Sequence, residues 1–311
     1  MPCYHPITGY YSKKPNPLTG KHPLVFSQDN CLVPIPQVVP CGRCIGCRLE
    51  RSKQWATRCL HEASLHTSNC FLTLTFDDAH LPSDGSLNVS DFQKFMKRLR
   101  KFLSPKQVRF FHCGEYGAKF KRPHHHVILF GHDFDDKVQW KDNNGVKTYL
   151  SESLIKLWPS GFSTVSDVNY ASIAYVSRYV LKKFSIYQTN SPSDNSLLSV
   201  SQQKKLHYGD LHPEYVTMSR NPGIGSKWYD QFKTDIYPAG FCVLDGGIKA
   251  RSPIFYDRKY ELEFPLDYAM LQIERSKKAS LHDNSRARLL DKEEIVLHNI
   301  STKQRGFENG D

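Results

Sequence analysis

Residues 108–131 constrain the fold of this chain most strongly, because they read as two strands joined by a short turn. Residues 108–116 contain valine, phenylalanine and tyrosine side chains, and residues 124–130 combine three histidines with an apolar run. The second strand follows Pro123, and a proline is tolerated at the first residue of a strand. Residues 117–123 are enough to turn the chain back. We therefore predict an antiparallel β-hairpin.

The histidines of the second strand indicate a metal site. Side chains alternate across a strand, so His124 and His126 share one face while His125 lies on the other. The antiparallel pairing also brings Glu115 beside His124. Two imidazoles and one carboxylate can hold a divalent cation and leave coordination positions open for a substrate phosphate. A histidine-rich strand without an ion is the alternative.

Residues 171–184 read as a helix that carries two tyrosines. Tyr175 and Tyr179 lie four residues apart, on one face and a single turn from each other, and Lys182 follows on about the same side. A phenol is a poor nucleophile at neutral pH, but it can attack a phosphodiester when a divalent ion polarises the phosphate. The product would be a covalent phosphotyrosine, which a free hydroxyl can reverse, and a second tyrosine would permit a second cleavage. The alternative is an amphipathic helix whose tyrosines belong to the core.

Three cysteines, Cys41, Cys44 and Cys47, lie around one tight turn with two residues between successive thiols. This spacing suits zinc and, less well, an iron–sulfur cluster. The candidates for a fourth ligand are Cys3, His5, Cys31 and Cys59. The chain has nine cysteines, an odd number, so a secreted disulfide framework is not expected. A structural zinc and no metal at all both stay open, and we assign this cluster no catalytic role.

The charge and hydropathy of the chain fit a soluble protein with a polyanionic partner. The formal net charge is +11 over 311 residues, and the phosphates of nucleic acid would attract such a chain from a distance. No apolar run is long enough to cross a membrane, and the first residues lack an apolar signal region. We therefore expect an intracellular protein that does not contact membranes.

The other periodic segments predict an α+β protein. Outside the hairpin and the tyrosine helix, we expect a helix at 48–66, a central strand at 71–76, a short helix at 152–158 and a strand at 162–168. A further helix begins at a capping box formed by Ser90 and Gln93. Its apolar stripe consists of Phe92, Phe95, Met96, Leu99, Phe102 and Leu103.

Three segments, in this order, resemble the rolling-circle replication initiators of the His-hydrophobic-His endonuclease superfamily. They are Phe-Leu-Thr-Leu-Thr at 71–75, Arg122-Pro-His124-His-His126, and Tyr175-x-x-x-Tyr179-x-x-Lys182. The chain is especially similar to initiators of small single-stranded DNA phages of the microvirus group, in the gokushovirus branch. Those proteins also have a Met-x-Cys-x-x-Pro start, a Cys-Gly-x-Cys-x-x-Cys segment, a Gly-Glu-Tyr-Gly turn and a Met-Ser-x-x-Pro-Gly-Ile-Gly segment, here at 218–225. The resemblance covers about residues 1–260.

The resemblance implies a central antiparallel sheet flanked by helices, with the histidine strand central and the tyrosine helix packed beside it. It also implies Mg²⁺ or Mn²⁺ bound by His124, His126 and a third polar ligand, for which Glu115 is our candidate. Tyr175 and Tyr179 become the nucleophiles.

By the same resemblance, Lys182 becomes a positioning or charge-stabilising group. Two positions depart from the family pattern. His125 stands where an apolar or aromatic residue is usual, which leaves a shifted assignment of the histidine pair open. Arg178 stands just before the second tyrosine, where the family often has a lysine. The substitution keeps the positive charge but changes the geometry of the hydrogen-bond donors.

We expect the chain to be organised in consecutive segments. These are an N-terminal, loop-rich arm with the cysteine cluster and a helix (1–66), the endonuclease core (67–185), a flexible insertion (186–210), the C-terminal part of the core (211–262), and a charged, helical, partly disordered tail (263–311). Residues 220–227 contain turn glycines that could instead lay backbone amides against a phosphate.

These observations predict a metal-dependent endonuclease that nicks and rejoins phage DNA at its replication origin, in the cytoplasm of an infected bacterium. The candidate DNA contacts are Arg122, Arg178, Lys183, Arg220 and Lys227. The sequence has no phosphate-binding loop of the NTPase type, so strand unwinding must come from a partner. The resemblance implies that a host helicase unwinds the strands and that a host polymerase extends them. The alternatives are a non-catalytic, zinc-containing nucleic-acid-binding protein and a metal-dependent nuclease that uses water.

Overall fold

The computed structural model describes residues 3–17, 20–117, 120–143, 145–185, 208–244 and 247–302, and it describes no side chains for 178–185. Most of the insertion expected at 186–210 therefore lies outside the described residues. The chain divides into two compact units, one within residues 1–50 and 276–303 and the other within residues 51–275. No helix in the described part of the chain is both long and apolar enough to cross a membrane.

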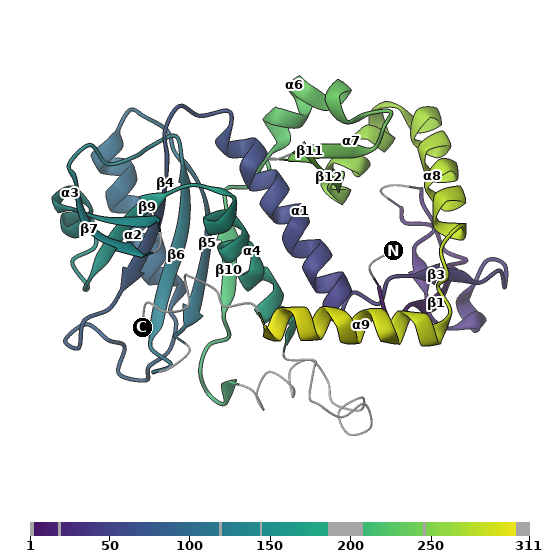
Figure 1. The fold of residues 1–311 in the computed structure, drawn as a ribbon, viewed down its shortest axis with the longest axis horizontal. Coiled ribbons are helices and arrows are strands. Elements are labelled where there is room, and N and C mark those ends of the chain that lie inside the picture. The colour runs from purple at the N-terminus through teal and green to yellow at the C-terminus, as the bar shows by residue number, and fades with distance from the viewer. Residues whose placement is uncertain are drawn as a thin grey trace. The chain divides into compact units, whose positions relative to one another are not determined.

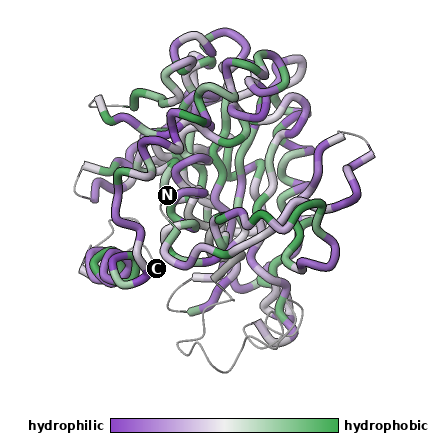
Figure 2. Tube along the Cα trace, turned by 90° about the vertical axis from the view of Figure 1, so that its right-hand side faces the viewer, coloured by the Kyte–Doolittle hydropathy of each residue, from purple (hydrophilic) through white to green (hydrophobic). Residues whose placement is uncertain are grey.

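The larger unit is built on a seven-stranded antiparallel sheet, which confirms the predicted α+β fold (Figure 1). In the order β10-β5-β6-β4-β9-β8-β7, its strands are Tyr215–Met218, Arg109–Tyr116, Pro123–Phe130, Asn69–Thr75, Ser163–Asp167, Val146–Ser151 and Lys137–Asn143. The histidine strand β6 lies in the interior of the sheet, and Pro123 is its first residue, as predicted. Hydrophobic segments run along the strands (Figure 2).

Helices cover both faces of this sheet (Figure 1). On one face, α2 (Val89–Leu103) and α3 (Glu152–Leu157) pack on the inward residues of β4, β6 and β9 around the buried Trp158. On the other face, α4 (Tyr170–Ser185) and the part of α1 (Ile45–Ala63) that belongs to this unit pack on the alternate residues of β4 and β6 and on residues of β5. Because the β4 and β6 residues alternate between the two cores, both strands read as almost continuous apolar runs.

The start of α2 differs from the prediction. Asn88 is the N-cap, and its side chain accepts a hydrogen bond from the backbone N–H of Ser90, so Ser90 and Gln93 do not form the cap. The apolar stripe is confirmed for Phe92, Phe95, Met96 and Leu99, which are buried. Phe102 is 55% exposed, because it lies in the last turn, where the helix passes the edge of the core.

The larger unit also contains two helices, α6 (Ser226–Ile236) and α7 (Ile254–Glu263), and a small sheet, the hairpin of β11 (Phe241–Leu244) and β12 (Ile248–Arg251), that the sequence did not predict. The part of α8 (Pro265–Ser280) within this unit belongs to the tail that was expected to be helical. Four buried tyrosines, a cysteine and aliphatic residues form their common core.

The smaller unit contains a three-stranded sheet of β1 (Ile7–Tyr11), β2 (Leu24–Val25) and β3 (Gln37–Val39) and a short 3₁₀ helix, η1 (Gln28–Asn30). The arm expected to be loop-rich thus contains a sheet, which its proline and turn residues concealed because the strands are so short. The helical character of the tail is confirmed by α9 (Arg286–Ser301).

Candidate metal centres and the tyrosine helix

The register of the β5–β6 hairpin brings the predicted triad together. Glu115 lies directly opposite His124, and Cys113 lies opposite His126, so Glu115, His124 and His126 share one face of the sheet. The Oε1 atom of Glu115 lies 2.7 Å from Nε2 of His124 and 2.9 Å from Nε2 of His126. All three side chains are buried, and their ligand atoms form a group that can hold a metal ion.

The hydrogen bonds behind the two histidines direct their lone pairs toward the same point. Nδ1 of His124 lies 3.1 Å from the backbone oxygen of Arg122, which can only accept, so Nδ1 carries the hydrogen. In the neutral ring, Nε2 then presents a lone pair. Nδ1 of His126 lies 3.1 Å from the hydroxyl of Thr73. Metal-binding histidines are usually oriented in this way by a partner on the other ring nitrogen.

The spacing of the donor atoms fits a divalent cation with octahedral coordination. Octahedral Mg²⁺ with ligands at about 2.1 Å places neighbouring ligand atoms about 3 Å apart, close to the two distances within the triad. Burial works to raise the pKa of Glu115, but the hydrogen bonds and positive charge that the His124 and His126 rings supply in their protonated form outweigh it and lower that pKa to about 2. The carboxylate is therefore ionised at neutral pH, as a metal ligand must be.

His125 points to the opposite face of the sheet. Its Nδ1 atom lies 3.1 Å from Nε2 of His112, whose ring stacks on Phe92 at a centroid distance of 3.5 Å. Burial lowers the pKa of His125 to about 3, and the positive potential of His124 and His126 adds to the effect. His125 is thus a neutral residue of the hydrophobic core, and the ligand atoms that converge are those of His124 and His126.

Tyr175 lies beside the triad. Its hydroxyl donates a hydrogen bond to Oε1 of Glu115 at 3.3 Å, and its ring meets the ring of His126 edge-on at a centroid distance of 5.1 Å. The first turn of α4 is fixed by reciprocal hydrogen bonds between Asn169 and Ser172, each at 2.9 Å. Tyr175 is one turn further on and faces the sheet. The side chains of Tyr179 and Lys182 lie outside the described residues, as do those of Arg178 and Lys183.

A pocket of about 210 Å³ opens over the triad. Besides His124, His126 and Tyr175, its lining includes Thr73, Trp140, Lys141, Phe162 and Thr164. Sequence reasoning missed these residues. The alternation of Thr73 and Thr75 with the buried Leu72 and Leu74 along β4 was a usable signal, because it marks a polar face on an otherwise apolar strand.

Three of the basic residues predicted to contact DNA have described side chains, and they fall in different places. Arg122 follows the turn of the hairpin, pairs with Asp78 at 2.8 Å, and lines a second pocket beside His124. Arg220 and Lys227 are exposed and follow β10, whose pairing places its end near Phe111. They therefore lie near the start of β5, whereas the triad lies near its end.

The geometry of residues 220–227 supports the interpretation of their glycines as turn residues. The backbone N–H of Gly225 donates to Oε2 of Glu62 at 2.7 Å and is thus already bound within the protein. Gly225 has φ 75°, a left-handed conformation that favours glycine, and it begins α6 against the hydroxyl of Tyr256. This geometry favours the interpretation as structural turn glycines over a phosphate-binding loop.

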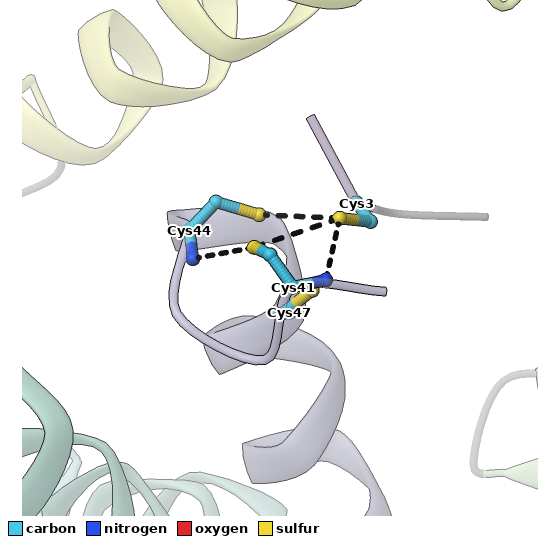
Figure 3. A group of neighbouring side chains, drawn as sticks. All are labelled: Cys3, Cys41, Cys44 and Cys47. Carbon is cyan, nitrogen blue, oxygen red and sulfur yellow. Dashed lines mark hydrogen bonds between the residues drawn. The ribbon is translucent and has the colours of Figure 1, made fainter. Parts of the chain in front are cut away.

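Four cysteines gather in the smaller unit (Figure 3). The Sγ atom of Cys3 lies 3.7 Å from that of Cys41 and 3.9 Å from that of Cys44. Tetrahedral zinc with Zn–S bonds of about 2.3 Å separates its sulfur ligands by about 3.8 Å. Together with Cys47, these thiols form a second group that can hold a metal ion, and all four are free of disulfide bonds.

Backbone N–H groups surround these sulfur atoms. Tyr4 donates to Cys44 at 3.4 Å, and Cys41 donates to Cys3 at 3.2 Å. Burial raises the pKa of Cys44, but backbone donors from Cys47 and Tyr4 outweigh it and bring that pKa to about 7. A thiol that ionises near neutrality is a good metal ligand.

Among the four candidates for the fourth position, the geometry selects Cys3. The other candidates lie elsewhere: His5 pairs with Glu293 at 2.5 Å, Cys31 follows η1, and Cys59 belongs to the core of the larger unit.

Comparisons with known proteins identify the family of this chain. The family described as "Replication-associated protein ORF2/G2P" matches residues 69–184, which include the triad and most of α4. "Replication-associated protein VP4" of Bdellovibrio phage phiMH2K is 34% identical over 234 residues, which cover 73% of this chain and 68% of that protein. "Replication-associated protein ORF2" of Spiroplasma virus 4 is 31% identical over 301 residues, which cover 90% of this chain and 88% of that protein.

"Replication-associated protein ORF4" of Chlamydia phage 1 is 35% identical over 175 residues, which cover 54% of this chain and 43% of that protein. No solved structure matches the chain. For the relatives from Bdellovibrio phage phiMH2K and Spiroplasma virus 4, the identity exceeds 30% and the matched residues cover more than two thirds of each protein. Both are described as replication-associated proteins. The chain therefore belongs to the family of microvirus-type replication-associated proteins.

Proposed function

We propose that this protein nicks and rejoins single-stranded DNA at a phage replication origin, using Tyr175 as a nucleophile. The observation that carries the proposal is the position of the Tyr175 hydroxyl, 3.3 Å from a carboxylate oxygen that also contacts His124 and His126. A nucleophile and a candidate metal centre thus meet on one sheet face, in a pocket open to solvent.

The triad would hold Mg²⁺ or Mn²⁺, which when bound would withdraw charge from a substrate phosphate. His124, His126 and Glu115 would supply two neutral nitrogen atoms and one oxygen, and the pocket that His124 and His126 line would admit the substrate phosphate. Glu115 also orients the phenol by accepting its hydrogen bond.

The chemical step is a displacement at phosphorus. The phenol oxygen of Tyr175 forms a bond to phosphorus as its proton passes to solvent water, and the bond from phosphorus to the 3′ oxygen breaks. That oxygen takes up a proton and becomes the 3′-hydroxyl primer, while the 5′ phosphate stays on the tyrosine. The bond energy is retained, so a 3′-hydroxyl can attack the phosphotyrosine and rejoin the strand.

Tyr179, the second tyrosine of the pair, would provide a second cleavage. Tyr179 follows Tyr175 by one turn of the same helix, and Lys182 follows it by three residues. We assign Tyr179 to the release and rejoining of the displaced strand and Lys182 to charge stabilisation. Arg122, Arg178 and Lys183 would contact the DNA backbone near the nick. Arg220 and Lys227, which follow β10, would contact DNA away from it.

The rest of the replication cycle would fall to the bacterial host, whose helicase and polymerase would act in the cytoplasm at the exposed primer. The cysteine cluster would bind a structural Zn²⁺ and stabilise the smaller unit. It has no part in the chemical step.

The test is a covalent adduct on a denaturing gel. Single-stranded genome fragments labelled at the 3′ end are incubated with the protein and Mn²⁺. The label should migrate with the protein, because the 5′ phosphate of the labelled strand is the one that is captured. Tyr175→Phe and Tyr179→Phe, alone and together, should weaken and then abolish the adduct.

The matched control is Tyr170→Phe, because Tyr170 lies in the same helix but is 42% exposed. This variant should form the adduct normally. Cleavage without an adduct would replace the tyrosine mechanism with attack by water. Binding with neither cleavage nor adduct would leave a non-catalytic nucleic-acid-binding protein.

A further inference from the structure

The sheet face that carries the triad continues as a row of hydroxyl groups. His126 lies opposite Thr73, and Thr73 lies opposite Thr164. The next row of paired residues begins with the apolar Ile128 and Phe71. It then becomes polar: Phe71 pairs with Ser166, Ser166 with Thr148, and Thr148 with Lys141. Residues paired in this way share a face, so a path of polar side chains leads from the triad to the edge strand β7.

An irregularity in β7 directs an aromatic side chain to the end of this path. Gln139 pairs with Tyr149 and Lys141 pairs with Thr148, so Trp140 has no partner across the strands. The extra residue is a β-bulge, a feature that re-aims side chains and is common beside active sites. Trp140 and Lys141 consequently both line the pocket, although neighbours in a regular strand point to opposite faces.

Trp140 is accompanied by a second exposed aromatic ring. Trp140 is 43% exposed and Phe162 is 45% exposed, and their ring centroids lie 4.9 Å apart at an angle of 61°. Large aromatic side chains are usually buried, and these two are held at the pocket wall by β7 and by the start of β9. Both rings are thus partly exposed at the pocket wall.

Positive charge lies at the same place. The Nζ atom of Lys141 lies 3.9 Å from the centroid of Trp140. Within the described residues, no carboxylate forms an ion pair with Lys141, so its charge is available to a phosphate. A charged amine beside two exposed rings is the arrangement that binds the backbone and the bases of a single strand.

We propose that Trp140, Phe162 and Lys141 form a binding platform for single-stranded DNA, which holds unpaired bases next to the phosphate to be cut. The hydroxyl groups of Thr164, Ser166 and Thr148 contact the backbone between the platform and the triad. Bases can stack on the two rings only when they are unpaired, so the platform selects single-stranded over duplex DNA. This inference rests on the proposed function for the identity of the strand and its position over the triad.

The test measures binding separately from cleavage. The full-length chain with Tyr175→Phe and Tyr179→Phe serves as parent, so that no adduct forms, and Mg²⁺ is present throughout. Fluorescence anisotropy then follows a labelled oligothymidylate and a hairpin duplex of equal length. Trp140→Ala should weaken binding of the oligothymidylate by about tenfold or more, the effect of losing one stacked base, with little change for the duplex. Trp140→Tyr should restore most of the affinity.

Control variants separate stacking from general effects. Phe26→Ala removes an aromatic ring that is 63% exposed in the smaller unit, and it should leave both affinities unchanged. Lys141→Ala should reduce the salt dependence of binding, because one phosphate contact is lost. Lys94→Ala removes an exposed charge on α2 and should not do so.

A second readout uses the tryptophan itself. Bases that stack on Trp140 quench its fluorescence, so oligothymidylate should quench the parent and not a Trp140→Phe variant. Circular dichroism and thermal unfolding show whether each variant is folded.

The proposal is overturned if Trp140→Ala and Phe162→Ala bind oligothymidylate as the parent does. It is also overturned if single-stranded and duplex binding fall equally, because the loss would then not concern stacked bases. If the platform variants lose single-strand binding while the wild-type chain never forms an adduct, the platform stands and the tyrosine mechanism is wrong. If the adduct forms and the variants bind normally, the reverse holds.

Discussion

Thr73 lies directly opposite His126 on the neighbouring strand, and its hydroxyl oxygen is 3.1 Å from Nδ1 of His126. A strand pairing thereby sets the orientation of a candidate metal ligand, with Nε2 turned toward Glu115. The contact joins two adjacent strands in the interior of the sheet.

We expect Thr73→Val to weaken Mn²⁺ binding about 10- to 100-fold, because partners of this kind orient the ligand. Isothermal titration calorimetry measures the affinity. Thr164→Val is the matched control, since Thr164 lies opposite Thr73 and also lines the pocket, without a ring nitrogen as partner. Equal affinities for the two variants would show that Thr73 does not orient His126.

The assignment of the histidine pair predicts opposite results at adjacent positions. His126→Ala should lose Mn²⁺ binding at concentrations that saturate the wild type, because one of the ligands of the triad is gone. His125→Phe should keep metal binding, because His125 lies on the opposite face among Phe76, Phe92 and Trp158. Loss of metal binding in His125→Phe, with a normal unfolding midpoint, would mean that the pair is shifted by one residue.

The cysteine cluster predicts one bound zinc per chain by elemental analysis. Cys44→Ser should lose the metal and lower the unfolding midpoint by roughly 5–10 °C, because metal binding contributes directly to folding. Cys31→Ser is the control, since Cys31 is buried in the same part of the chain but lies outside the cluster. Retention of zinc by Cys44→Ser would exclude the four-cysteine site.

His61 predicts a loss of stability in acid. Its ring stacks on Trp228 at a centroid distance of 3.5 Å, and burial lowers its pKa to about 4. Between pH 6.5 and 4, the unfolded chain binds a proton at this position and the folded chain does not. This histidine therefore costs the fold nothing above pH 6.5 and on the order of 3 kcal/mol at pH 4.

His61→Phe should flatten the pH dependence of the free energy of unfolding across that window, as measured by urea denaturation at a series of pH values. His282→Phe, at an exposed position, serves as control. An unchanged slope in His61→Phe would show that this ring is not the group responsible.

Patterns that depend on neighbouring residues were predicted well. Alternation along 124–130 placed His124 and His126 on one face, and the length of the turn placed Glu115 opposite His124, as the register confirms. The helices at α1, α2, α3 and α4 and the strands β4 and β9 were also predicted, because 3.6- and 2-residue periods are local properties of a sequence. The cap of α2 was misplaced because Asn88 and Ser90 are both good capping residues, and only the geometry of the turn distinguishes them.

By itself the sequence determined the hairpin, the spacing of the tyrosines and the three-cysteine turn, since each depends on residues close together in the chain. Tertiary structure alone decided which distant strands meet. The pairing of β4 between β6 and β9 brings Thr73 to His126 and Thr164 to Thr73, and the bulge in β7 brings Trp140 to the same pocket. Likewise, Cys3 joins a cluster 38 residues away. Such long-range pairings are selected by the packing of the whole core, which no local pattern encodes.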